Sequence, residues 1–405
     1  MTLYDVLIIG GGPAGLSVAT GLARQLYRAV VFDSGVYRNA LSNHMHNVAT
    51  WDHSSPAEFR REARERILAR YDTIQFENIE IKNVQKTSEG YFKAFDALDR
   101  VWTGRKLVLA NGVRDLFPDI DGYKECWGRG IFHCLFCHGY EERGCASAGL
   151  LAVGDVANPM VAMHFARMAK RFASTVTLYT DGAEELAQTL QESTRGTGIK
   201  VNKKKISKLV KGHGASDVHV IFEDGTQVTE GFLTHKPKTE INGPFAEQLG
   251  LQLTPTGDLE ATAPFYSTSV PGVFAAGDCA SPVKVVATAM SSGVLVAGGL
   301  VGQLQDELCL GVWVGERPLE EMHRLCMMHM SLTNDLYSYE KERQEAEEDK
   351  TRTLNGVQVP SDLLDVPSNA AKNVLRQIIL ELERQLHQAY AAQARSGKRC
   401  DRQLR

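Results

Sequence analysis

A glycine-rich turn near the N-terminus constrains the fold of this chain more than any other feature. Residues 10–15 read Gly-Gly-Gly-Pro-Ala-Gly, directly after an apolar run of strand length at 4–9 and before a helical pattern at 13–24. A strand, a glycine turn and a helix in this order meet the structural condition for a dinucleotide-binding fingerprint. The glycines permit a tight turn, the approach of a pyrophosphate and close helix packing, and the helix N-terminus offers N–H groups to the phosphates. The motif therefore predicts a dinucleotide site formed by Gly10, Gly12, Pro13, Ala14 and Gly15.

Acidic residues after two other predicted strands indicate that the dinucleotide is FAD. The second predicted strand ends at Asp33, at about the distance from the glycine turn that is expected of a ribose-binding carboxylate. A buried-strand run at 273–276 leads into Gly277 and Asp278, whose carboxylate can accept hydrogen bonds from ribityl hydroxyls. The apolar strand that ends near Ala110 closes the first half of the same site.

The flavin-binding elements lie at both ends of the first 305 residues, so the FAD-binding domain must be split by an insertion. The insertion again alternates strands, at 149–154 and 175–180, with a crossover helix at 160–173. The sequence therefore predicts an α/β fold with two Rossmann-like nucleotide-binding domains and an α-helical tail. The expected limits are 1–115 and 244–305 for the FAD-binding domain, 116–243 for the inserted NAD(P)-like domain and 306–405 for the tail.

The inserted domain has a poor nucleotide-binding turn. Residues 154–159 read Gly-Asp-Val-Ala-Asn-Pro, which lacks the repeated glycines and places an acid where a pyrophosphate would lie. The following strand ends in Thr-Asp-Gly at 180–182, without the arginines that a 2′-phosphate favours. The pattern predicts that NADPH binds poorly or not at all.

A Cys-x-x-Cys pair, Cys134 and Cys137, lies near the start of the inserted domain, and two interpretations of it are open. A zinc half-site needs two further ligands, and only Cys126, His133 and His138 lie nearby in the sequence. A redox pair needs sulfurs that can form a bond, a lowered thiolate pKa and a base, and the two flanking histidines can supply the last two. The flavin site favours the redox pair, with Cys134, Cys137 and His138 as catalytic residues.

The overall composition excludes several classes of function. The net charge is −4, so the chain has no global basic field, and neither nucleic acid nor a membrane surface is expected as a partner. The N-terminus has no basic region or cleavage site of a secretory signal, and the apolar stretch near 293–304 is too short and glycine-rich to span a bilayer. Eight cysteines with one close pair are typical of a reduced compartment. We expect a cytoplasmic protein.

The motifs of residues 1–305 resemble those of low-molecular-weight thioredoxin reductases. More closely, Arg-Asn-Ala-Leu-Ser-Asn-His-Met-His at 38–46 and Cys-His-Gly-Tyr-Glu at 137–141 resemble the gliotoxin-oxidase type of fungal dithiol oxidases. The resemblance implies FAD, a homodimer, and oxidation of a small-molecule dithiol to a disulfide with oxygen as acceptor. It also implies that Asn39 contacts the cofactor, Cys137 faces the flavin, Cys134 exchanges with substrate and His138 moves protons.

The tail contains a candidate metal motif of a different kind. A helix is predicted from residue 319 to about 347, and within it Asn334, Ser338 and Glu342 stand at i, i+4 and i+8, so their oxygens project from one face. Such oxygens suit Mg²⁺, although an ordinary solvated face has the same pattern. The string Asn-Asp-Leu-Tyr-Ser-Tyr-Glu-Lys-Glu at 334–342 resembles the second metal motif of class I fungal terpene cyclases. No aspartate-rich first motif occurs upstream, so the motif is interpreted as vestigial and no working cyclase is expected.

The leading hypothesis is an FAD-dependent oxidase of a small-molecule dithiol in fungal secondary metabolism. One alternative is an NADPH-dependent thioredoxin or disulfide reductase. A second is an inactive fusion product, in which the tail blocks dimerisation or acts as a docking module. A third is a cyclase fragment that completes its metal site with a partner chain. Nothing in the sequence specifies the natural substrate.

Overall fold

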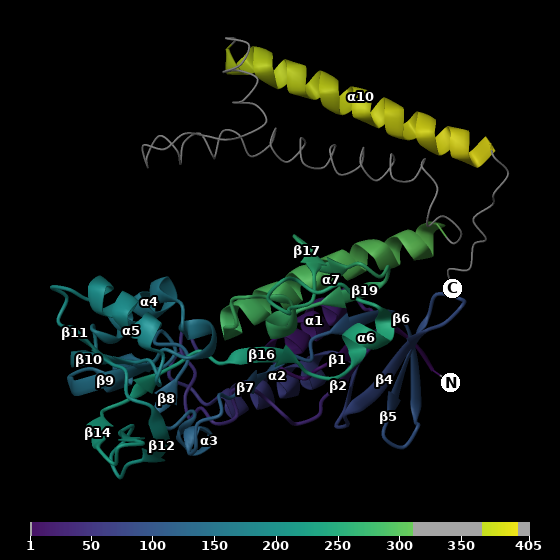
Figure 1. The fold of residues 1–405 in the computed structure, drawn as a ribbon. Coiled ribbons are helices and arrows are strands. Elements are labelled where there is room, and N and C mark those ends of the chain that lie inside the picture. The colour runs from purple at the N-terminus through teal and green to yellow at the C-terminus, as the bar shows by residue number, and fades with distance from the viewer. Residues whose placement is uncertain (1, 311–366, 396–405) are drawn as a thin grey trace. The chain divides into compact units, whose positions relative to one another are not determined.

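The computed structural model describes residues 2–310 and 367–395. The chain divides into two compact units, Met1–Val301 and Gly302–Arg405, which are described separately. The first unit contains two large sheets (Figure 1). The candidate metal residues Asn334, Ser338 and Glu342, with the predicted helix that carries them, lie outside the described residues.

The first sheet has nine strands and a parallel centre. Its main order is β17-β18-β19-β6-β1-β2-β3, with the β4–β5 hairpin attached to β6. The parallel strands are β1 (Leu3–Ile9), β2 (Ala29–Phe32), β3 (Ile74–Glu77), β6 (Val101–Leu109) and β19 (Val273–Ala275). The antiparallel strands are β4 (Ile81–Lys86), β5 (Phe92–Asp96), β17 (Ala261–Thr262) and β18 (Ser267–Thr268).

Alternate residues of the central strands pack on opposite faces of this sheet. Leu7 and Ile9 belong to a core that the β4–β5 hairpin and α6 (Phe245–Leu249) complete. On the opposite face lie α1 (Pro13–Arg24) and α7 (Val286–Leu310), which touch almost backbone to backbone. A Cβ added to Gly293 would lie 2.4 Å from the carbonyl oxygen of Ala14, so only glycine fits at that crossing. Helix α2 (Pro56–Arg70) begins at Ser55, whose hydroxyl accepts the N–H of Glu58.

The second sheet is parallel, in the order β11-β10-β9-β15-β8. Leu150 faces a core shared with two helices, and its neighbour Leu151 faces a core shared with a small antiparallel sheet. The parallel strands are β8 (Ile131–Phe132), β9 (Cys145–Leu151), β10 (Ala173–Tyr179), β11 (Ile199–Asn202) and β15 (Leu233–Thr234). The covering elements are α3 (Tyr123–Cys126), α4 (Pro159–Ala169), α5 (Glu184–Ser193), β12 (Ile206–Lys211), β13 (Val218–Phe222) and β14 (Gln227–Glu230).

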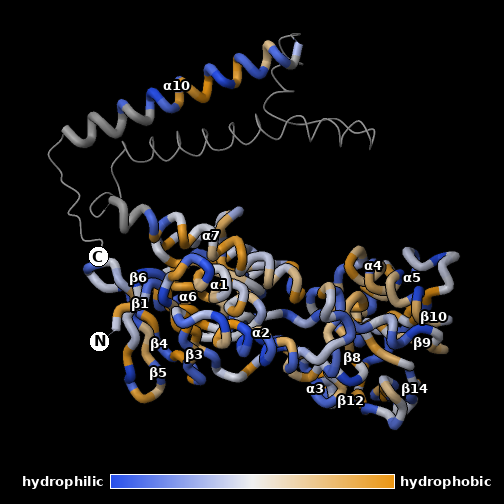
Figure 2. Tube along the Cα trace, turned by 180° about the vertical axis from the view of Figure 1, so that it is seen from behind, coloured by the Kyte–Doolittle hydropathy of each residue, from blue (hydrophilic) through white to orange (hydrophobic). Residues whose placement is uncertain are grey.

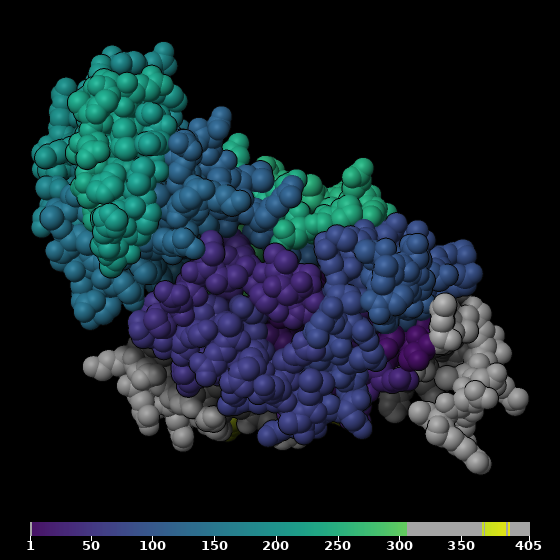
Figure 3. All heavy atoms as spheres, turned by 90° about the horizontal axis from the view of Figure 1, so that it is seen from below, coloured from purple at the N-terminus to yellow at the C-terminus, as the bar shows by residue number. Residues whose placement is uncertain are grey.

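A two-stranded antiparallel ribbon connects the two sheets. It consists of β7 (Val113–Leu116) and β16 (Lys238–Ile241), with Arg114 opposite Glu240. We call residues 2–112 and 242–301 the first lobe and residues 117–237 the second lobe. Figure 3 shows the second lobe, largely in teal, as a separate mass beside the purple and blue first lobe.

The structure confirms the predicted architecture of two Rossmann-like units. Helix α1 has the predicted limits, whereas the crossover helix of the second lobe was predicted too long. Helix α4 ends at Ala169, because a turn at residues 170–172 precedes β10, which begins at Ala173. Strand β9 begins at Cys145 and ends at Leu151, so the strand predicted at 149–154 was placed too late. The exact limits of the three domains stay a prediction.

Helix α7 corrects the expectation that the apolar stretch near residues 293–304 is too short to span a bilayer. Among the described residues, Val286–Gln305 is long and apolar enough to cross a membrane by length and composition. Val296 and Leu300 are nevertheless fully buried, and Gly293 makes the close crossing with α1. These contacts pack one side of α7 on α1, while 33% of the apolar window is buried in all.

The second unit contains α10 (Ser368–Arg395). The sequence favours Ser368 as the N-cap of a second tail helix, whereas in the structure Ser368 is the first residue of the helix itself. Apolar and polar residues alternate along it (Figure 2). Its buried residues are Ala371, Leu375, Ile379 and Leu382, whereas Val374 and Ile378 are exposed. From its spacing, the sequence predicts an apolar face of this helix formed by Val374, Leu375, Ile378, Leu382, Leu386 and Ala389. That prediction is wrong in part, because the buried stripe is turned by about one residue. The side chains of Leu386 and Ala389 lie outside the described set.

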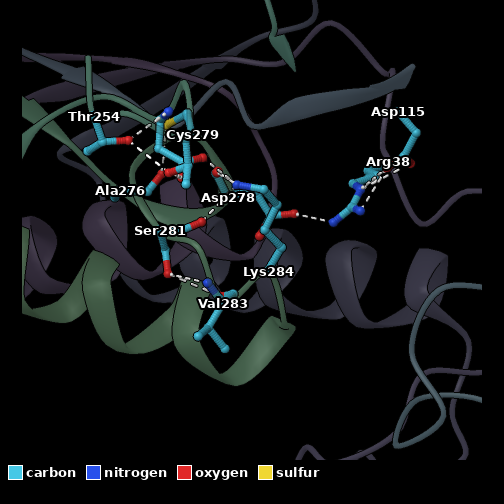
Figure 4. A network of polar contacts seen from close by, with 11 residues as sticks. Arg38, Asp115, Thr254, Ala276, Asp278, Cys279, Ser281, Val283 and Lys284 are labelled. Atoms are coloured by element: carbon cyan, nitrogen blue, oxygen red, sulfur yellow. Dashed lines mark hydrogen bonds and ion pairs between the residues drawn. The ribbon is translucent and has the colours of Figure 1, made fainter. Parts of the chain in front are cut away.

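A buried ion pair holds the loop that follows β19. Lys284 Nζ lies 2.5 Å from Asp258 Oδ1, and both side chains are less than one tenth exposed. The same ammonium donates to the carbonyl oxygens of Asp278 and Ser281, each at 2.8 Å (Figure 4). Three acceptors therefore compensate the desolvation of one cation and fix the path of the backbone around Gly277 and Asp278.

Removing only the cation should destabilise the first lobe strongly. In Lys284→Met the Asp258 carboxylate stays buried without its partner, which typically costs about 3–5 kcal/mol. The double variant Asp258→Asn with Lys284→Met removes both charges and should recover much of the loss. Urea unfolding at saturating FAD measures both values. A loss below about 1 kcal/mol in the single variant would contradict this role of the pair.

Candidate active site

One cavity of about 770 Å³ brings the glycine turn and the Cys-x-x-Cys pair together. It lies at the carboxyl ends of β1, β2, β6 and β19, where ligands bind to open parallel sheets. Of the predicted site residues with described positions, only Gly15 is absent from its wall. The lining includes Gly10, Gly12, Pro13, Ala14, Asp33, Asn39, Ala110, Cys134, Cys137, His138, Gly277 and Asp278.

The glycines of the turn have distinct tasks. A Cβ on Gly10, whose φ is +119°, would lie 2.1 Å from the carbonyl oxygen of Ala110, and a Cβ on Gly15 would lie 1.9 Å from the carbonyl oxygen of Gly10. These two residues therefore let β1, β6 and α1 approach one another. A Cβ on Gly12 would meet no protein atom within 4 Å, and no side chain caps α1 there. The open space and the N–H groups of the helix N-terminus fit a pyrophosphate, as FAD binding requires.

Asp33 lies directly beside the glycine turn. A Cβ on Gly11 would lie 2.3 Å from the Asp33 carboxyl carbon. The carboxylate accepts hydrogen bonds from the Tyr37 hydroxyl, at 2.7 and 2.8 Å, and from the N–H of Gly35. Burial, together with this carboxylate, raises the pKa of Tyr37 to about 12, so the phenol stays a donor. Asp33 lines the cavity beside the turn, and its contact to a ribose stays a prediction.

Asn39 lines the cavity, but its side-chain oxygen accepts a hydrogen bond from Arg60 at 2.9 Å. The Arg60 guanidinium in turn stacks on the Tyr37 ring, 3.7 Å from its centroid. The structure therefore shows Asn39 as a residue that supports this wall, with its contact to a cofactor still a prediction.

Arg38 joins three separate segments of the cavity wall. Its guanidinium donates to Asp115 on β7 at 2.8 Å and to Asp278 at 3.2 Å (Figure 4). Burial acts to lower the pKa of Arg38, but the two carboxylates outweigh it and raise that pKa. Arg38 was not predicted as a site residue, because its two acidic partners are 77 and 240 residues away in the sequence.

The Cys134–Cys137 pair forms a disulfide in a one-turn loop after β8. The N–H of Cys137 donates to Cys134 Sγ at 3.1 Å, and the N–H of His138 donates to the Cys134 carbonyl at 2.9 Å. An N–H directed at Sγ stabilises a thiolate at Cys134 after reduction. The bonded pair, with Cys126 buried in a separate aromatic cluster, does not support the zinc interpretation.

Glu142 orients His138, the predicted base. His138 Nε2 lies 2.8 Å from Glu142 Oε1, and the imidazole stacks on Phe132 with 3.8 Å between centroids. Glu142 is only 7% exposed and also accepts the Ser216 hydroxyl at 2.5 Å. Burial acts to raise the pKa of Glu142, but the hydrogen bonds from His138 and Ser216 hold it below its ordinary value. A permanent carboxylate therefore fixes the imidazole beside the disulfide.

The structure gives different roles to His133 and His138, the two histidines that flank the cysteines. Burial, reinforced by the positive charge of Arg38, lowers the pKa of His133 to about 4, so this imidazole is neutral at neutral pH. It stacks on Trp127 and serves packing. His138 is the one held by a carboxylate. Glu142 was missed from the sequence, although its spacing of four residues from His138 is a signal for such a contact.

The turn before α4 has its polar groups engaged within the protein. Asn158 Oδ1 accepts the N–H groups of Met160 and Val161, at 3.0 and 3.3 Å, and so caps the helix. Asp181 accepts hydrogen bonds from Lys205 Nζ and from the N–H of Ile206, both at 2.8 Å. Asn158 and Asp181, the polar residues that follow β9 and β10, thus have partners within the protein.

A split dinucleotide-binding fold whose cavity contains a Cys-x-x-Cys disulfide defines the flavin-type disulfide oxidoreductases. The sequence pattern of the family described as pyridine nucleotide-disulphide oxidoreductase matches residues 4–293, and the chain belongs to this family. It is an oxidoreductase, and the family implies binding of FAD and NAD(P)H.

Named relatives and solved structures agree with this assignment. The chain is 47% identical over 305 residues to the thioredoxin reductase aclD of Aspergillus oryzae, covering 75% of this chain and 96% of the relative. It is 43% identical to the thioredoxin reductase sirT of Leptosphaeria maculans, over 78% and 97%. The solved structure of an oxidoreductase from Agrobacterium tumefaciens matches with a TM-score of 0.68 at 31% sequence identity, and the match covers 75% of this chain and 99% of that one. The crystal structure of HlmI matches with a TM-score of 0.67 at 29% identity, covering 75% of this chain and 93% of that one.

The C-terminal part of the chain matches a second family. The pattern described as terpene synthase family 2, C-terminal metal binding, covers residues 306–385. This range includes Asn334, Ser338 and Glu342. The predicted resemblance of the tail to a terpene cyclase fragment is therefore confirmed.

Filling the open space at Gly12 should weaken FAD binding without unfolding the protein. Gly12→Ala places a methyl group where the pyrophosphate would lie, and we expect at least a tenfold loss of affinity, about 1.4 kcal/mol. Gly302→Ala, where a Cβ also meets no atom within 4 Å, serves as the control. Flavin fluorescence titration measures the affinity and thermal unfolding of the flavin-free protein reports the fold. Equal FAD affinity in both variants would contradict a phosphate site at Gly12.

The His138–Glu142 pair predicts graded losses in thiol exchange. His138→Gln removes the base and should slow reduction of the disulfide by dithiothreitol by about 10²-fold or more. Glu142→Gln only releases the imidazole and should slow the reduction less. Glu240→Gln, the same change at an exposed position on β16, should leave the rate unchanged. Stopped-flow measurement of thiol exchange checks all three. The proposed orientation fails if Glu142→Gln matches the Glu240→Gln control.

Proposed function

We propose that the protein is an FAD-dependent oxidase that converts a small-molecule dithiol into a disulfide, with oxygen as electron acceptor. The observation that carries the proposal is the disulfide in the wall of the flavin-type cavity. Cys134 has an N–H directed at its sulfur, and His138 is held beside the pair by Glu142. An electrophilic disulfide and an oriented base therefore line the same cavity.

The cysteines and His138 account for the thiol chemistry. One substrate thiolate attacks Cys134 Sγ, the Cys134–Cys137 bond breaks, and a mixed disulfide forms. The second substrate thiol then attacks the substrate sulfur of that bond, which releases the oxidised substrate and leaves both cysteines reduced. His138 takes the proton from the attacking thiol. FAD would be held by the glycine turn and Asp278, and would supply the two-electron redox chemistry that links the reduced cysteines to oxygen, with hydrogen peroxide as the product.

The surface around the disulfide favours an apolar substrate. Phe136, between the two cysteines, is 76% exposed, and Tyr140 three residues beyond them is also exposed. Arg143 lies over the Tyr140 ring at 4.0 Å and keeps it in place. Two exposed aromatic rings beside a reactive disulfide provide apolar contact area for a small dithiol.

Oxygen rather than NADPH is proposed as the electron partner because of the α4 turn. Asn158 caps the helix and Lys205 occupies Asp181, so a nicotinamide nucleotide would have to displace internal hydrogen bonds. The names of the relatives favour the alternative, an NADPH-dependent reductase of thioredoxin. Proteins of this class are typically homodimers, and we propose the same assembly here. We assign no catalytic step to the terpene synthase-like tail.

Oxygen uptake discriminates the oxidase from the reductase. FAD-reconstituted protein given dithiothreitol and no NADPH should consume oxygen and form hydrogen peroxide. Cys134→Ser should abolish the uptake while retaining the flavin absorbance, and Cys400→Ser, outside the matched residues 4–293, should leave it unchanged. An oxygen electrode with a peroxide assay measures both products.

Two results would count against the oxidase. Flavin that dithiothreitol does not reduce but NADPH does would identify the reductase. Uptake that persists in Cys134→Ser would show that the flavin reacts without the disulfide.

A further inference from the structure

Two histidines and a glutamate converge on one point next to the disulfide loop, where His46 Nδ1 contacts the carbonyl oxygen of Cys137. His46 Nε2 lies 3.0 Å from His53 Nδ1 and 3.2 Å from Glu141 Oε1, and the remaining distance, from His53 Nδ1 to Glu141 Oε1, is 4.0 Å. No step of thiol exchange uses these side chains. Their ligand atoms all lie within 4.8 Å of one another.

The spacing of the three atoms matches the coordination sphere of a zinc ion. A point about 2.0 Å from all three atoms exists within their triangle, and zinc binds imidazole nitrogen and carboxylate oxygen at about 2.0–2.2 Å. Two histidines with one carboxylate are a known zinc donor set that leaves a position for water. Only small side-chain movements would be needed to reach a tetrahedral arrangement.

The hydrogen bond of His46 Nδ1 leaves Nε2, the other ring nitrogen, free to bind a metal. Nδ1 of His46 lies 2.6 Å from the carbonyl oxygen of Cys137, which only an N–H at Nδ1 can satisfy. The lone pair of the neutral ring then lies on Nε2, the atom that faces His53 and Glu141. A backbone carbonyl that fixes the imidazole tautomer is the usual outer partner of a metal-binding histidine. Without a cation, or a second proton on His46, two acceptors would face each other across 3.2 Å.

The backbone of the histidine loop is shaped to present both rings. Residues 45 and 54 close the loop through an antiparallel bridge, with the Met45 N–H donating to the Ser54 carbonyl at 2.7 Å. Within it Asn47 and His53 have φ near +60°, a conformation that costs energy for residues other than glycine. His44 stacks on His53, with 4.1 Å between ring centroids, and so restrains the exposed ring.

We propose that His46, His53 and Glu141 bind a divalent transition-metal ion, with zinc as the best match. The two histidines belong to the first lobe, between β2 and α2, whereas Glu141 belongs to the short helix Tyr140–Glu142 of the second lobe. The ion therefore ties the disulfide loop to the flavin-binding lobe, across the β7–β16 ribbon. Binding of the ion does not rest on the oxidase function.

Metal titration of the FAD-loaded protein tests the site. The probes are Co²⁺, followed by its visible absorption, and Zn²⁺, in competition with a chromophoric chelator. Wild type should bind one equivalent, and His53→Ala and Glu141→Gln should each lose at least about 10-fold in affinity. His219→Ala, on β13 and outside the cluster, should bind as wild type does. Zn²⁺ should also raise the unfolding temperature of wild type but not of Glu141→Gln.

A double variant, Cys134→Ser with Cys137→Ser, separates this site from the thiols. It should still bind one equivalent of Zn²⁺ with the affinity of wild type. Loss of binding in the double variant would assign the metal to the cysteines and overturn the proposal. Equal Zn²⁺ affinity in wild type and Glu141→Gln, or no binding by wild type at all, would overturn it as well.

Discussion

The contact between β1 and α1 is the constraint on which the rest of the site depends. The carbonyl oxygen of Gly10 occupies the space that a side chain at position 15 would need, so the helix can start immediately beside the strand. This places the positive end of α1 at the carboxyl edge of the sheet, where β2, β6 and β19 also end. Helix α7 then packs on α1 at Gly293, and the loop that carries Asp278 reaches the same edge. One backbone-to-backbone approach thus sets the positions of residues that are far apart in the sequence.

Buried charges secure the wall that this approach creates. Arg38 and Lys284 each neutralise acidic groups around Gly277 and Asp278, and both are largely removed from water. In such surroundings an unpaired charge is costly, so the ion pairs specify one arrangement of the loops. On the disulfide side of the cavity, the buried carboxylate of Glu142 is likewise compensated, by hydrogen bonds with His138 and Ser216. Charge pairing therefore positions both ends of the cavity.

The sequence predicted those parts of the fold and site that local patterns encode. The glycine turn, Asp33, Asp278 and the cysteine pair are recognisable because a few neighbouring residues determine what each motif can do. Arg38 escaped prediction, because its role depends on Asp115 and Asp278, which only the folded sheet brings near it. The face of α10 was misjudged, because Val374 and Leu375 are equally apolar and only packing determines which of them is buried.

The ribbon of β7 and β16 has a consequence for how the chain folds. Strand β19 pairs with β6 in the register Val273 to Leu107, a contact that spans more than 160 residues of chain. Closing so long a loop is entropically unfavourable and slows folding. The paired ribbon brings residues 113 and 241 together, and with it in place the loop to be closed shortens to about 38 residues. Because loop-closure entropy depends only weakly on length, a ribbon that is already paired lowers the cost of completing the central sheet by about 1 kcal/mol.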